Sequence, residues 1–404
     1  MKVLLVSQEM PPETGWGGIG TYVNTISQAL TGKGAEVHVL SVVPGLPAST
    51  RQIGGVTVHR RPLPEVHGAV DRIPEAWRRA WLSTAVTWLT HRLSLRPDVV
   101  ECPEWMAEGF GLGMASRLPL VVHLHSSARQ IFPHNGQGRR ARGMDGRAAI
   151  WLEETAVRRA HAVISTPWNL DEMAPLLGLE PAALHPLWYP LHLPARLPVA
   201  DPGRQQVTFL GRFEPRKGPD VLLGAVPAVL AAVPEARFAF VGRDATGVGQ
   251  LASADWLRRE AARLGVTHAV EVREEFGREA VMRALREASV CAFPSRWESF
   301  GYSMAEAQGV GRPVVVSSIP ALRALVDEGA AGATAASEDP GSWAEPLIAL
   351  LKDPARAAAL GDAGATRLAQ ISDPSRVADE TLAVYEHAIE RRRRRERAGT
   401  VRHR

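Results

Sequence analysis

Two cations follow an apolar run in the second half of the chain. The run VTFLG at 207–211 ends just before Arg212, and Lys217 follows five residues later, ahead of a helical pattern. A forked guanidinium and a mobile ammonium at the end of a strand suit a diphosphate group. A solvated loop with two unrelated charges explains the stretch equally well. The pattern alone therefore indicates an anion site without establishing one.

A second stretch, PSRWESFGYSMAEAQG, carries two glutamates eight residues apart. Glu298 falls in a predicted loop, and Glu306 falls more than one turn into a predicted helix. We expect the first amides of that helix, those of Phe300, Gly301 and Tyr302, to bind an anion. The spacing does not make the two carboxylates a close glycosidase-type pair. They suit two separate sets of sugar hydroxyls, although a capping or surface glutamate is the simpler interpretation of either one alone.

A glycine-rich stretch near the start, VSQEMPPETGWGGIGTYV, contains a literal G-x-G-x-x-G at Gly15, Gly17 and Gly20. A dinucleotide loop needs these glycines directly after the first strand and an acidic residue after the second. Here seven residues separate the first apolar run from Gly15, and the second run, AEVHVLSVV, ends in Pro-Gly without an acid. The pattern thus argues against NAD or FAD. Gly17 and Gly18 still allow the backbone to approach a ligand, and a flexible surface loop is the alternative.

Together these stretches resemble the family-4 retaining glycosyltransferases of the GT-B fold, the glycosyl transferases group 1. The shared pieces are GGIGTYV, GRFEPRKG, VGR at 241–243, and PSRWESFGYSMAEAQGVGRPVV with its E-x7-E. The resemblance spans essentially the whole chain and is strongest over 207–317. It implies a nucleotide-sugar donor. The donor-binding residues that it implies are Gly17, Gly18, Arg212, Lys217, Glu298, Phe300, Gly301, Tyr302 and Glu306.

The resemblance also implies individual roles. Arg212 and Lys217 hold the donor diphosphate, Glu306 binds the ribose hydroxyls, and Glu298 binds the transferred sugar. A histidine touches the same sugar, and we favour His125 for this role. The implied catalytic residues are His125, Glu298, Arg212 and Lys217.

The sequence offers two candidate histidines, and the chain departs from the family pattern in two places. VVHLHSS offers His123 and His125, and alternate positions of a strand face the same way, so spacing does not separate them. We favour His125 because it is nearer the carboxyl end of the run. Ala321 and Leu322 stand where the family often has an acid, which weakens any inference about the sugar. Asp244 follows VGR in place of the more usual glycine-rich continuation.

Electrostatics favours a reaction without a metal ion or cofactor. Breaking the bond between the anomeric carbon and the diphosphate builds negative charge, which Arg212, Lys217 and the helix N-terminus would stabilise. The sequence contains no Asp-x-Asp pair. The resemblance implies a front-face displacement with retention, onto a small-molecule, glycan or lipid-linked acceptor. A nucleotide-sugar epimerase of the same fold and a non-catalytic nucleotide-sugar-binding protein are the alternatives.

The elements that must position these residues follow a regular rhythm. Short β-rich runs alternate with helical segments on both sides of a proline-rich passage at 185–203, as in parallel sheets covered on both faces. Ligands bind such sheets at the carboxyl ends of the strands. We predict an α/β GT-B fold with two doubly wound Rossmann-like domains facing across a cleft. The predicted parts are an acceptor domain at 1–190, a donor domain at 191–373, a helix at 374–390 free to pack back on the first domain, and a disordered basic tail at 391–404.

Composition limits the class of protein. A chain of 404 residues, 45% hydrophobic and 22% charged, is an ordinary soluble protein. The formal charge of +4 comes from the segment 391–404, whose eight Arg and one Glu leave −3 on the other 390 residues, so we expect no nucleic-acid partner. No apolar run reaches the ~18 residues of a membrane span, and the first run is too short for a signal peptide. We expect a cytoplasmic protein in which Cys102 and Cys291 are buried thiols.

One predicted helix, at 72–97, combines tryptophan with arginine. Trp77, Trp81 and Trp88 lie among several arginines in this range. Such a helix suits weak contact with the inner face of an anionic membrane, whereas a crossover helix packed on the first sheet is the plainer interpretation. The basic loop at 138–147 could attract an acidic acceptor, and the basic tail could add an electrostatic tether.

Overall fold

A computed structural model of the chain divides it into two compact units. Unit 1 contains Met1–Gln130, Arg139–His192 and Ser372–Arg404, and unit 2 contains Ile131–Gly138 and Leu193–Ile371. The structure describes all residues except 13, 16, 64–73, 199–200, 202, 246–251, 276, 337 and 403–404. Parts of the predicted linker, of the predicted helix at 72–97 and of the predicted tail therefore lie outside the described residues. The chain passes between the units near the predicted boundaries, but the short segment Ile131–Gly138 belongs to unit 2, which the sequence did not indicate.

The described part of unit 1 is built on an eight-stranded sheet in the order β3-β4-β2-β1-β5-β6-β7-β8. The strands are β1 (Lys2–Val6), β2 (Glu36–Val43), β3 (Ser49–Ile53), β4 (Val56–Pro62), β5 (Val99–Pro103), β6 (Leu120–His123), β7 (Ala162–Ser165) and β8 (Leu184–Pro186). Neighbouring strands are parallel except β3 and β4, which pair antiparallel at the edge. Because the strand order reverses between β1 and β5, the carboxyl ends of these two strands form a switch point of the sheet.

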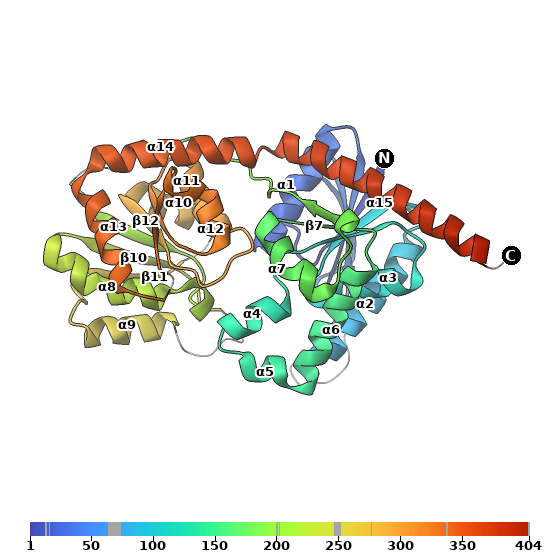
Figure 1. Cartoon of the computed structure of the whole chain (residues 1–404), viewed down its shortest axis with the longest axis horizontal. Helices are drawn as coiled ribbons and strands as arrows, with labels where there is room; N and C mark the ends of the chain where they lie inside the picture. Colours follow the sequence, from blue (N-terminus) through green and yellow to red (C-terminus); the bar gives the residue numbers. More distant parts are fainter. Residues whose placement is uncertain are drawn as a thin grey trace. The chain divides into compact units, whose positions relative to one another are not determined.

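Helices cover both faces of this sheet. They are α1 (Gly18–Gly32), α2 (Glu75–Arg92), α3 (Phe110–Ala115), α5 (Gly138–Arg142), α6 (Met144–Arg159), α7 (Pro167–Leu177) and α15 (Pro374–Arg402), while α4 (Ala128–His134) straddles the two units. Apolar residues of α2, α3, α6 and α7 form one core with the strands. Helix α15 packs against α1 and contacts β5, β6 and β7 (Figure 1). The helix predicted at 374–390 thus returns to unit 1.

The basic segment predicted as disordered at 391–404 is instead helical as far as Arg402. Two of its arginines bind the surface of unit 1. Arg391 pairs with Glu180, and Arg392 Nε donates a hydrogen bond to the Arg117 carbonyl at 3.1 Å. Pairs four residues apart, such as Arg392 with Glu396, further support the helix. These contacts explain why a charged segment continues α15.

The described part of unit 2 has a six-stranded sheet in the order β11-β10-β9-β12-β13-β14, with all neighbours parallel. The strands are β9 (Gln206–Leu210), β10 (Arg237–Gly242), β11 (Val270–Glu274), β12 (Val290–Phe293), β13 (Val314–Ser317) and β14 (Ala333–Ala335). Relative to chain order this is the 3-2-1-4-5-6 arrangement of a Rossmann sheet. Its switch point lies between β9 and β12, the two strands that carry the predicted diphosphate and glutamate stretches.

The helices of unit 2 are α8 (Pro219–Ala232), α9 (Ala254–Arg263), α10 (Arg278–Glu287), α11 (Tyr302–Gly309), α12 (Pro320–Leu325), α13 (Gly341–Lys352) and α14 (Pro354–Ile371). Apolar residues of α8, α9 and α13 bury one face of the sheet around Phe209, Phe240 and Trp343. Helices α10, α11 and α12 contact the strands as well, and α14 packs against α11. The sheet is thus a rigid base for the loops at its carboxyl edge.

Candidate functional site

One glycine holds the loop after β9 against the end of β12. Gly218 has φ +67°, and a Cβ atom there would lie 2.0 Å from the carbonyl oxygen of Pro294. No side chain fits at that distance, so glycine is required for the two loops to touch. Because β9 and β12 are neighbours in the sheet, this contact brings Lys217 and Glu298 together. The two predicted site residues, 81 positions apart, meet directly.

Glu298 lies at the centre of a cluster of charges. Its carboxylate accepts hydrogen bonds from Lys217 Nζ at 2.5 Å, Ser295 Oγ at 2.8 Å and Arg216 Nη1 at 3.3 Å. Burial by itself would raise the pKa of Glu298, but Lys217 and Arg216 lower it to about 2. Glu298 is therefore ionised at any physiological pH. Lys217 and Arg216 each have further N–H donors besides those that bind Glu298.

Arg216, Glu214 and Asn135 support this cluster, and the sequence analysis missed all three. Arg216 Nη2 donates to Glu214 Oε1 at 2.6 Å, and both side chains are buried. Asn135 Nδ2 donates to Glu214 Oε2 at 3.2 Å, while its Oδ1 accepts from the Arg216 amide at 3.2 Å. Arg212 lies farther out: its side chain is half-exposed and 3.3 Å from Glu214 Oε1. The inner arginine is thus held by carboxylates, and the outer one reaches solvent.

Helix α11 begins beside this cluster. Its N-cap is Gly301, with φ +100°, and Tyr302 is the first helical residue. The predicted start is therefore two residues early, because Phe300 lies before the cap, buried, with its ring 5.2 Å from that of Tyr302. Helix N-termini attract anions, and this one follows directly on Glu298. A small hollow opens here, lined by Lys217, Ser295, Glu298, Gly301, Ser303 and Leu322 among others.

Leu322 and Glu306 define two further parts of this region. Leu322, at the position where the family often has an acid, lines the hollow, and its Cδ2 atom lies 2.9 Å from where a Cβ of Gly301 would be. Glu306 is half-buried on α11, eight residues after Glu298 as predicted. Burial raises the pKa of Glu306 to about 7, with Arg278 opposing this rise. The pKa values of the two glutamates are therefore shifted in opposite directions. Glu298 is ionised at physiological pH, whereas the pKa of Glu306 lies at about 7.

In unit 1 the glycine-rich stretch forms the start of α1. Gly17 is the N-cap and Gly18 the first helical residue, well after β1 ends at Val6. Glu9, which the sequence analysis missed, accepts a hydrogen bond from the Gly20 amide at 2.8 Å. A Cβ atom at Gly17 would lie 2.7 Å from Glu9 Oε2. The long passage between strand and helix agrees with the argument against a dinucleotide loop.

The two candidate histidines stack on one another at the carboxyl end of β6. The ring centroids of His123 and His125 are 4.3 Å apart with the planes 17° from parallel, so both side chains face the same way, as the strand pattern predicts. His125 Nδ1 is 3.0 Å from the Tyr189 hydroxyl. The His125 amide donates to the buried carboxylate of Glu104 at 2.7 Å, a support that the sequence analysis missed. Burial lowers the pKa of His125, with a further contribution from His123, and so keeps its imidazole neutral.

Beneath these histidines, Glu101 is buried between two tyrosines. Glu101 Oε1 accepts a hydrogen bond from Tyr22 Oη at 2.7 Å, and Oε2 accepts one from Tyr385 Oη at 2.6 Å. His123 Nδ1 lies 3.5 Å from the same Oε1. Tyr385 lies on α15, so a helix from the last part of the sequence contributes to the buried residues next to the histidines. Burial raises the pKa of both tyrosines, which remain neutral donors.

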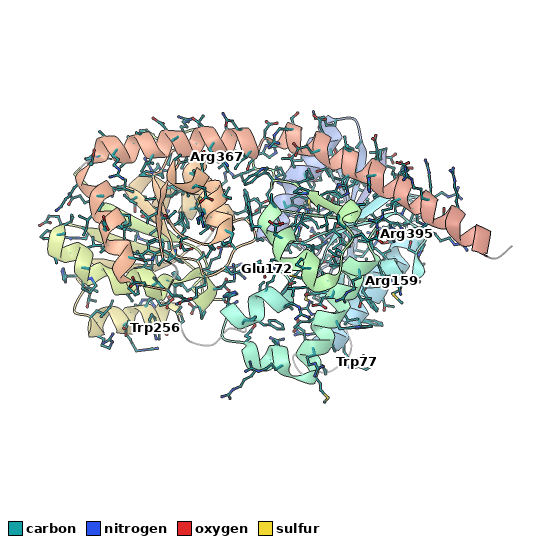
Figure 2. The ribbon with its side chains drawn as sticks, viewed as in Figure 1. Trp77, Arg159, Glu172, Trp256, Arg367 and Arg395 are labelled. Carbon is teal, nitrogen blue, oxygen red and sulfur yellow. The ribbon has the colours of Figure 1, made fainter. Side chains whose placement is uncertain are left out.

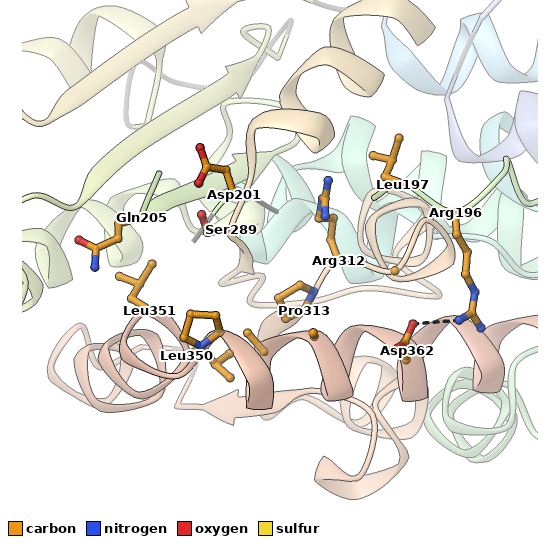
Figure 3. Close-up of a pocket in the computed structure, with 14 residues that line it drawn as sticks. Arg196, Leu197, Asp201, Gln205, Ser289, Arg312, Pro313, Leu350, Leu351 and Asp362 are labelled. Carbon is orange, nitrogen blue, oxygen red and sulfur yellow. Dashed lines mark hydrogen bonds and ion pairs between the residues drawn. The ribbon is translucent and has the colours of Figure 1, made fainter. Parts of the chain in front are cut away.

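A second hollow of unit 2 lies at the opposite edge of its sheet (Figure 3). Its lining includes the residues directly before β9, β12 and β13, which are Gln205, Ser289 and Pro313. Arg312 is buried here: its Nε donates to the Leu285 carbonyl at 2.6 Å and its Nη1 to the Pro198 carbonyl at 2.8 Å. These bonds join the segment that enters unit 2 to the end of α10. The hollow is separate from the Glu298 cluster, which lies at the carboxyl edge.

Solved structures with the same architecture identify the fold. Sucrose-phosphate synthase from Thermosynechococcus elongatus matches with a TM-score of 0.75 at 21% identity, over 95% of this chain and 98% of that one. The catalytic domain of starch synthase IV from Arabidopsis thaliana, bound to ADP and acarbose, matches with a TM-score of 0.71 at 14% identity, over 96% and 99%. With two doubly wound units of this kind, the chain has the GT-B fold.

Sequence comparisons identify the family of the chain. The family described as Glycosyl transferases group 1 matches residues 204–353, and the Glycosyl transferase 4-like domain matches residues 17–187. D-inositol 3-phosphate glycosyltransferase 1 of Catenulispora acidiphila is 30% identical over 408 aligned positions, covering 93% of this chain and 91% of that protein. The chain therefore belongs to the group 1 glycosyltransferase family, as the sequence motifs indicate.

The described residues contain neither a membrane-spanning helix nor a cluster of metal-binding side chains. No helix there combines the length and apolar character needed to cross a bilayer. In the same part of the chain, no three or more His, Cys, Asp or Glu side chains are grouped so that they could hold a metal ion. Cys102 and Cys291 are buried free thiols, as predicted.

Proposed function

We propose that the protein transfers a sugar from a nucleoside diphosphate to the hydroxyl of an acceptor, with retention of anomeric configuration and without a metal ion. The observation that carries this proposal is the cluster at the switch point of unit 2. There Lys217 and Arg216 lie on Glu298, with the half-exposed Arg212 nearby and the start of α11 directly after the glutamate. Cations and a helix N-terminus at one sheet edge suit a diphosphate.

The proposed chemistry follows from charge. When the bond between the anomeric carbon and the diphosphate breaks, its electron pair leaves with the diphosphate. Arg212 and Lys217 are proposed to stabilise that developing charge in place of a metal. The acceptor oxygen adds to the anomeric carbon on the face from which the diphosphate leaves, and the acceptor proton passes to the departing phosphate oxygen. Retention is supported by the likeness to retaining family-4 enzymes.

The remaining site residues are proposed to bind neutral groups. Glu298, fixed and ionised, accepts hydrogen bonds from hydroxyls of the transferred sugar, and Glu306 accepts those of the ribose. His125, kept neutral by burial, is proposed to contact the sugar, and its link to Tyr189 supports its choice over His123. The amides around Gly301 and at the start of α1, with Gly17 and Gly18, are proposed to complete the donor site.

The comparisons support the donor class and suggest acceptors. Starch synthase IV, of the same fold, is bound to ADP, which supports a nucleotide donor. The Catenulispora acidiphila relative is named for D-inositol 3-phosphate, a small-molecule acceptor. We therefore propose testing D-inositol 3-phosphate first, then malto-oligosaccharides and lipid-linked acceptors, each with UDP-, GDP- and ADP-sugars.

The decisive measurement is release of nucleoside diphosphate together with formation of a glycoside. We expect both from one donor and one acceptor, with the product keeping the anomeric configuration of the donor by NMR. Activity should persist in excess EDTA. An epimerised donor without a glycoside would identify a nucleotide-sugar epimerase, and binding without turnover on any acceptor would identify a binding protein. A strict requirement for Mn²⁺ or Mg²⁺ would contradict the proposed charge stabilisation.

Substitutions of Lys217 and Arg212 test the site itself. Lys217→Ala and Arg212→Ala should each lower kcat by about 10²-fold, because each removes one preorganised stabiliser of the leaving group. Lys352→Ala, at the exposed end of α13, is the matched control and should leave kcat unchanged. Thermal unfolding of each variant separates loss of catalysis from loss of fold. Near wild-type turnover in both Lys217→Ala and Arg212→Ala would overturn the diphosphate assignment.

A further inference from the structure

Helix α2 turns three tryptophans toward solvent. Trp77, Trp81 and Trp88 are 71%, 41% and 55% exposed. They are four and seven residues apart, so they lie on one face of the helix. The opposite face is buried through residues such as Val86 and Leu89, which pack in the core of unit 1. The helix is thus anchored to the sheet without its tryptophans, and the fold does not account for their exposure.

Helix α6 extends this apolar surface. Asp145 accepts hydrogen bonds from the amides of Glu75 and Ala76, each at 2.9 Å, which joins the N-termini of α2 and α6. Both helices contribute to the same core on one face of the sheet, so their outer faces point away from the sheet in the same direction. Met144 is 90% exposed and Trp151 is 56% exposed on α6. We name the tryptophan face by its five large side chains, Trp77, Trp81, Trp88, Met144 and Trp151; Trp77 is labelled in Figure 2.

The charges exposed around the tryptophan face are positive. Exposed arginines on α2, α5 and α6 are Arg92, Arg139, Arg140, Arg142, Arg147, Arg158 and Arg159. The carboxylates of these helices are buried or half-buried and engaged. Glu75 pairs with Arg78, Arg79 and Arg140; Asp145 caps α2; Glu153 pairs with Arg79; and Glu154 pairs with Arg129 and Arg158. Arg92 also lies over the Trp88 ring, 4.9 Å from its centroid. The exposed side of these helices thus combines large apolar side chains with arginines.

We propose that the tryptophan face docks on the surface of an anionic phospholipid membrane. Tryptophan rings settle at the boundary between headgroups and acyl chains, and surrounding arginines are attracted to anionic headgroups. Interfacial helices combine these two features on one rigid face. A protein partner fits less well, because the centres of protein interfaces are depleted in charge, whereas the helices that carry these tryptophans also expose arginines, one of them over the Trp88 ring. The inference stands on unit 1 alone and does not depend on the proposed transfer reaction.

The test measures binding of the full chain to vesicles. Co-sedimentation with vesicles of phosphatidylcholine alone and of phosphatidylcholine with phosphatidylglycerol gives the partition coefficient. We expect strong partition only with the anionic lipid, weakening as salt is raised. Brominated acyl chains should quench tryptophan fluorescence of the bound protein. Trp77→Ala/Trp88→Ala/Trp151→Ala should lower partition by at least about tenfold and remove most of that quenching.

Matched variants test whether vesicle binding depends on the tryptophan face or on exposed arginines and apolar side chains elsewhere. Arg139→Gln/Arg142→Gln should weaken binding to anionic vesicles by about tenfold, whereas Arg259→Gln/Arg356→Gln, equally exposed arginines of unit 2, should not. Leu176→Ala, 57% exposed on α7, is the apolar control. Circular dichroism and thermal unfolding verify that each variant folds. Equal partition of wild type and triple-tryptophan variant would overturn the proposal. So would vesicle-independent dimerisation that the triple variant abolishes, since the face would then bind a second copy.

Discussion

The carboxyl edges of the two sheets share a topology and differ in chemistry. In unit 2 the switch point is charged: Glu298, with a pKa of about 2, holds Lys217 and Arg216. In unit 1 the corresponding edge is aromatic, with His123 and His125 stacked above a buried carboxylate. The cations of unit 2 can stabilise a departing anion, whereas burial lowers the pKa of His125, so that this residue of unit 1 offers hydrogen bonds rather than charge.

This difference indicates how the fold divides the work. Strand order fixes where side chains gather, since both sheets place the loops that carry the candidate site residues at the carboxyl edge. Loop sequences then decide the chemistry of each edge. We infer that unit 2 recognises the donor through charge and that unit 1 contributes contacts made to the reacting sugar. The following three predictions test this division, from the largest expected effect to the smallest.

A substitution in the glycine-rich stretch should abolish transfer while sparing nucleotide binding. In Gly17→Val the new side chain meets Glu9 Oε2, 2.7 Å from the Cβ position, and displaces Glu9 from the start of α1. Because the proposed diphosphate and ribose contacts lie in unit 2, affinity for the nucleoside diphosphate should change by only about 1 kcal/mol, with the loss appearing in kcat. Calorimetry and turnover measurements check the two parts separately.

Gly32→Val provides the control for this experiment, because nothing lies within 4 Å of a Cβ atom at that end of the same helix. It should retain transfer. The same titrations decide the dinucleotide alternative. If wild-type protein bound NAD or FAD at micromolar concentration, the glycosyltransferase interpretation of this loop would be wrong, and unit 1 would have a nucleotide site of its own.

Nucleotide affinity should depend on the ionisation of Glu306. Its pKa of about 7 is raised by burial, and ribose hydroxyls donating to its carboxylate would favour the ionised form. Binding then releases a proton, so affinity should fall by up to about tenfold per pH unit below 7 and be flat above it. Glu306→Gln should remove this pH dependence of affinity. Titration of the nucleotide phosphate affects both proteins equally, so it cancels when the two pH profiles are subtracted. Parallel pH profiles would mean that Glu306 does not touch the ribose.

The smallest effect is expected from a substitution beneath the carboxyl edge of the unit 1 sheet. Tyr385→Phe removes the donor to Glu101 Oε2, a hydrogen bond of 2.6 Å between buried groups. We expect the free energy of unfolding to fall by about 1–3 kcal/mol, with nucleotide affinity unchanged. Denaturant titration measures the first quantity and calorimetry the second. Glu386→Gln, exposed on the same helix, should leave both unchanged. A large loss of nucleotide affinity in Tyr385→Phe would break the separation between the two edges.

Much of the fold could be predicted because parallel strands are long apolar runs. The strand β2, for example, spans almost the whole of the run AEVHVLSVV. Three strands gave no such signal: β3 is a polar edge strand, and β8 and β14 have only three residues each. The basic segment after residue 390 was misjudged because its charge predicts repulsion, while its helix depends on partners such as Glu180 that are distant in sequence.

The site could be predicted only where type and spacing carry meaning. Lys217, Glu298 and Glu306 stand in motifs, but their mutual contacts depend on Gly218 and the adjacency of β9 and β12. Arg216 lies in the same quoted stretch and was missed, since the directions of side chains in a short turn follow no periodicity. Glu9, Glu104 and Asn135 act through backbone amides or distant partners.

The tryptophans of α2 show what the sequence left open. Large apolar side chains on a crossover helix are usually assigned to the core, yet Trp77, Trp81 and Trp88 occupy its outer face. The small and aliphatic residues between them fill the core instead. Composition alone could not distinguish these two faces, because the three tryptophans form an apolar stripe of their own, opposite the stripe that packs in the core.

The return of α15 to unit 1 has a consequence for biosynthesis. Unit 2 follows His192 and its main segment is complete at Ile371, so the ribosome finishes it before residues such as Val384, Tyr385 and Ala388 exist. Until those residues emerge, the nascent first unit lacks the apolar side chains that cover its sheet beside α1. Domains usually fold in the order of their synthesis. Here the domain begun first is the one finished last, so its exposed surface must be protected while the second domain is translated.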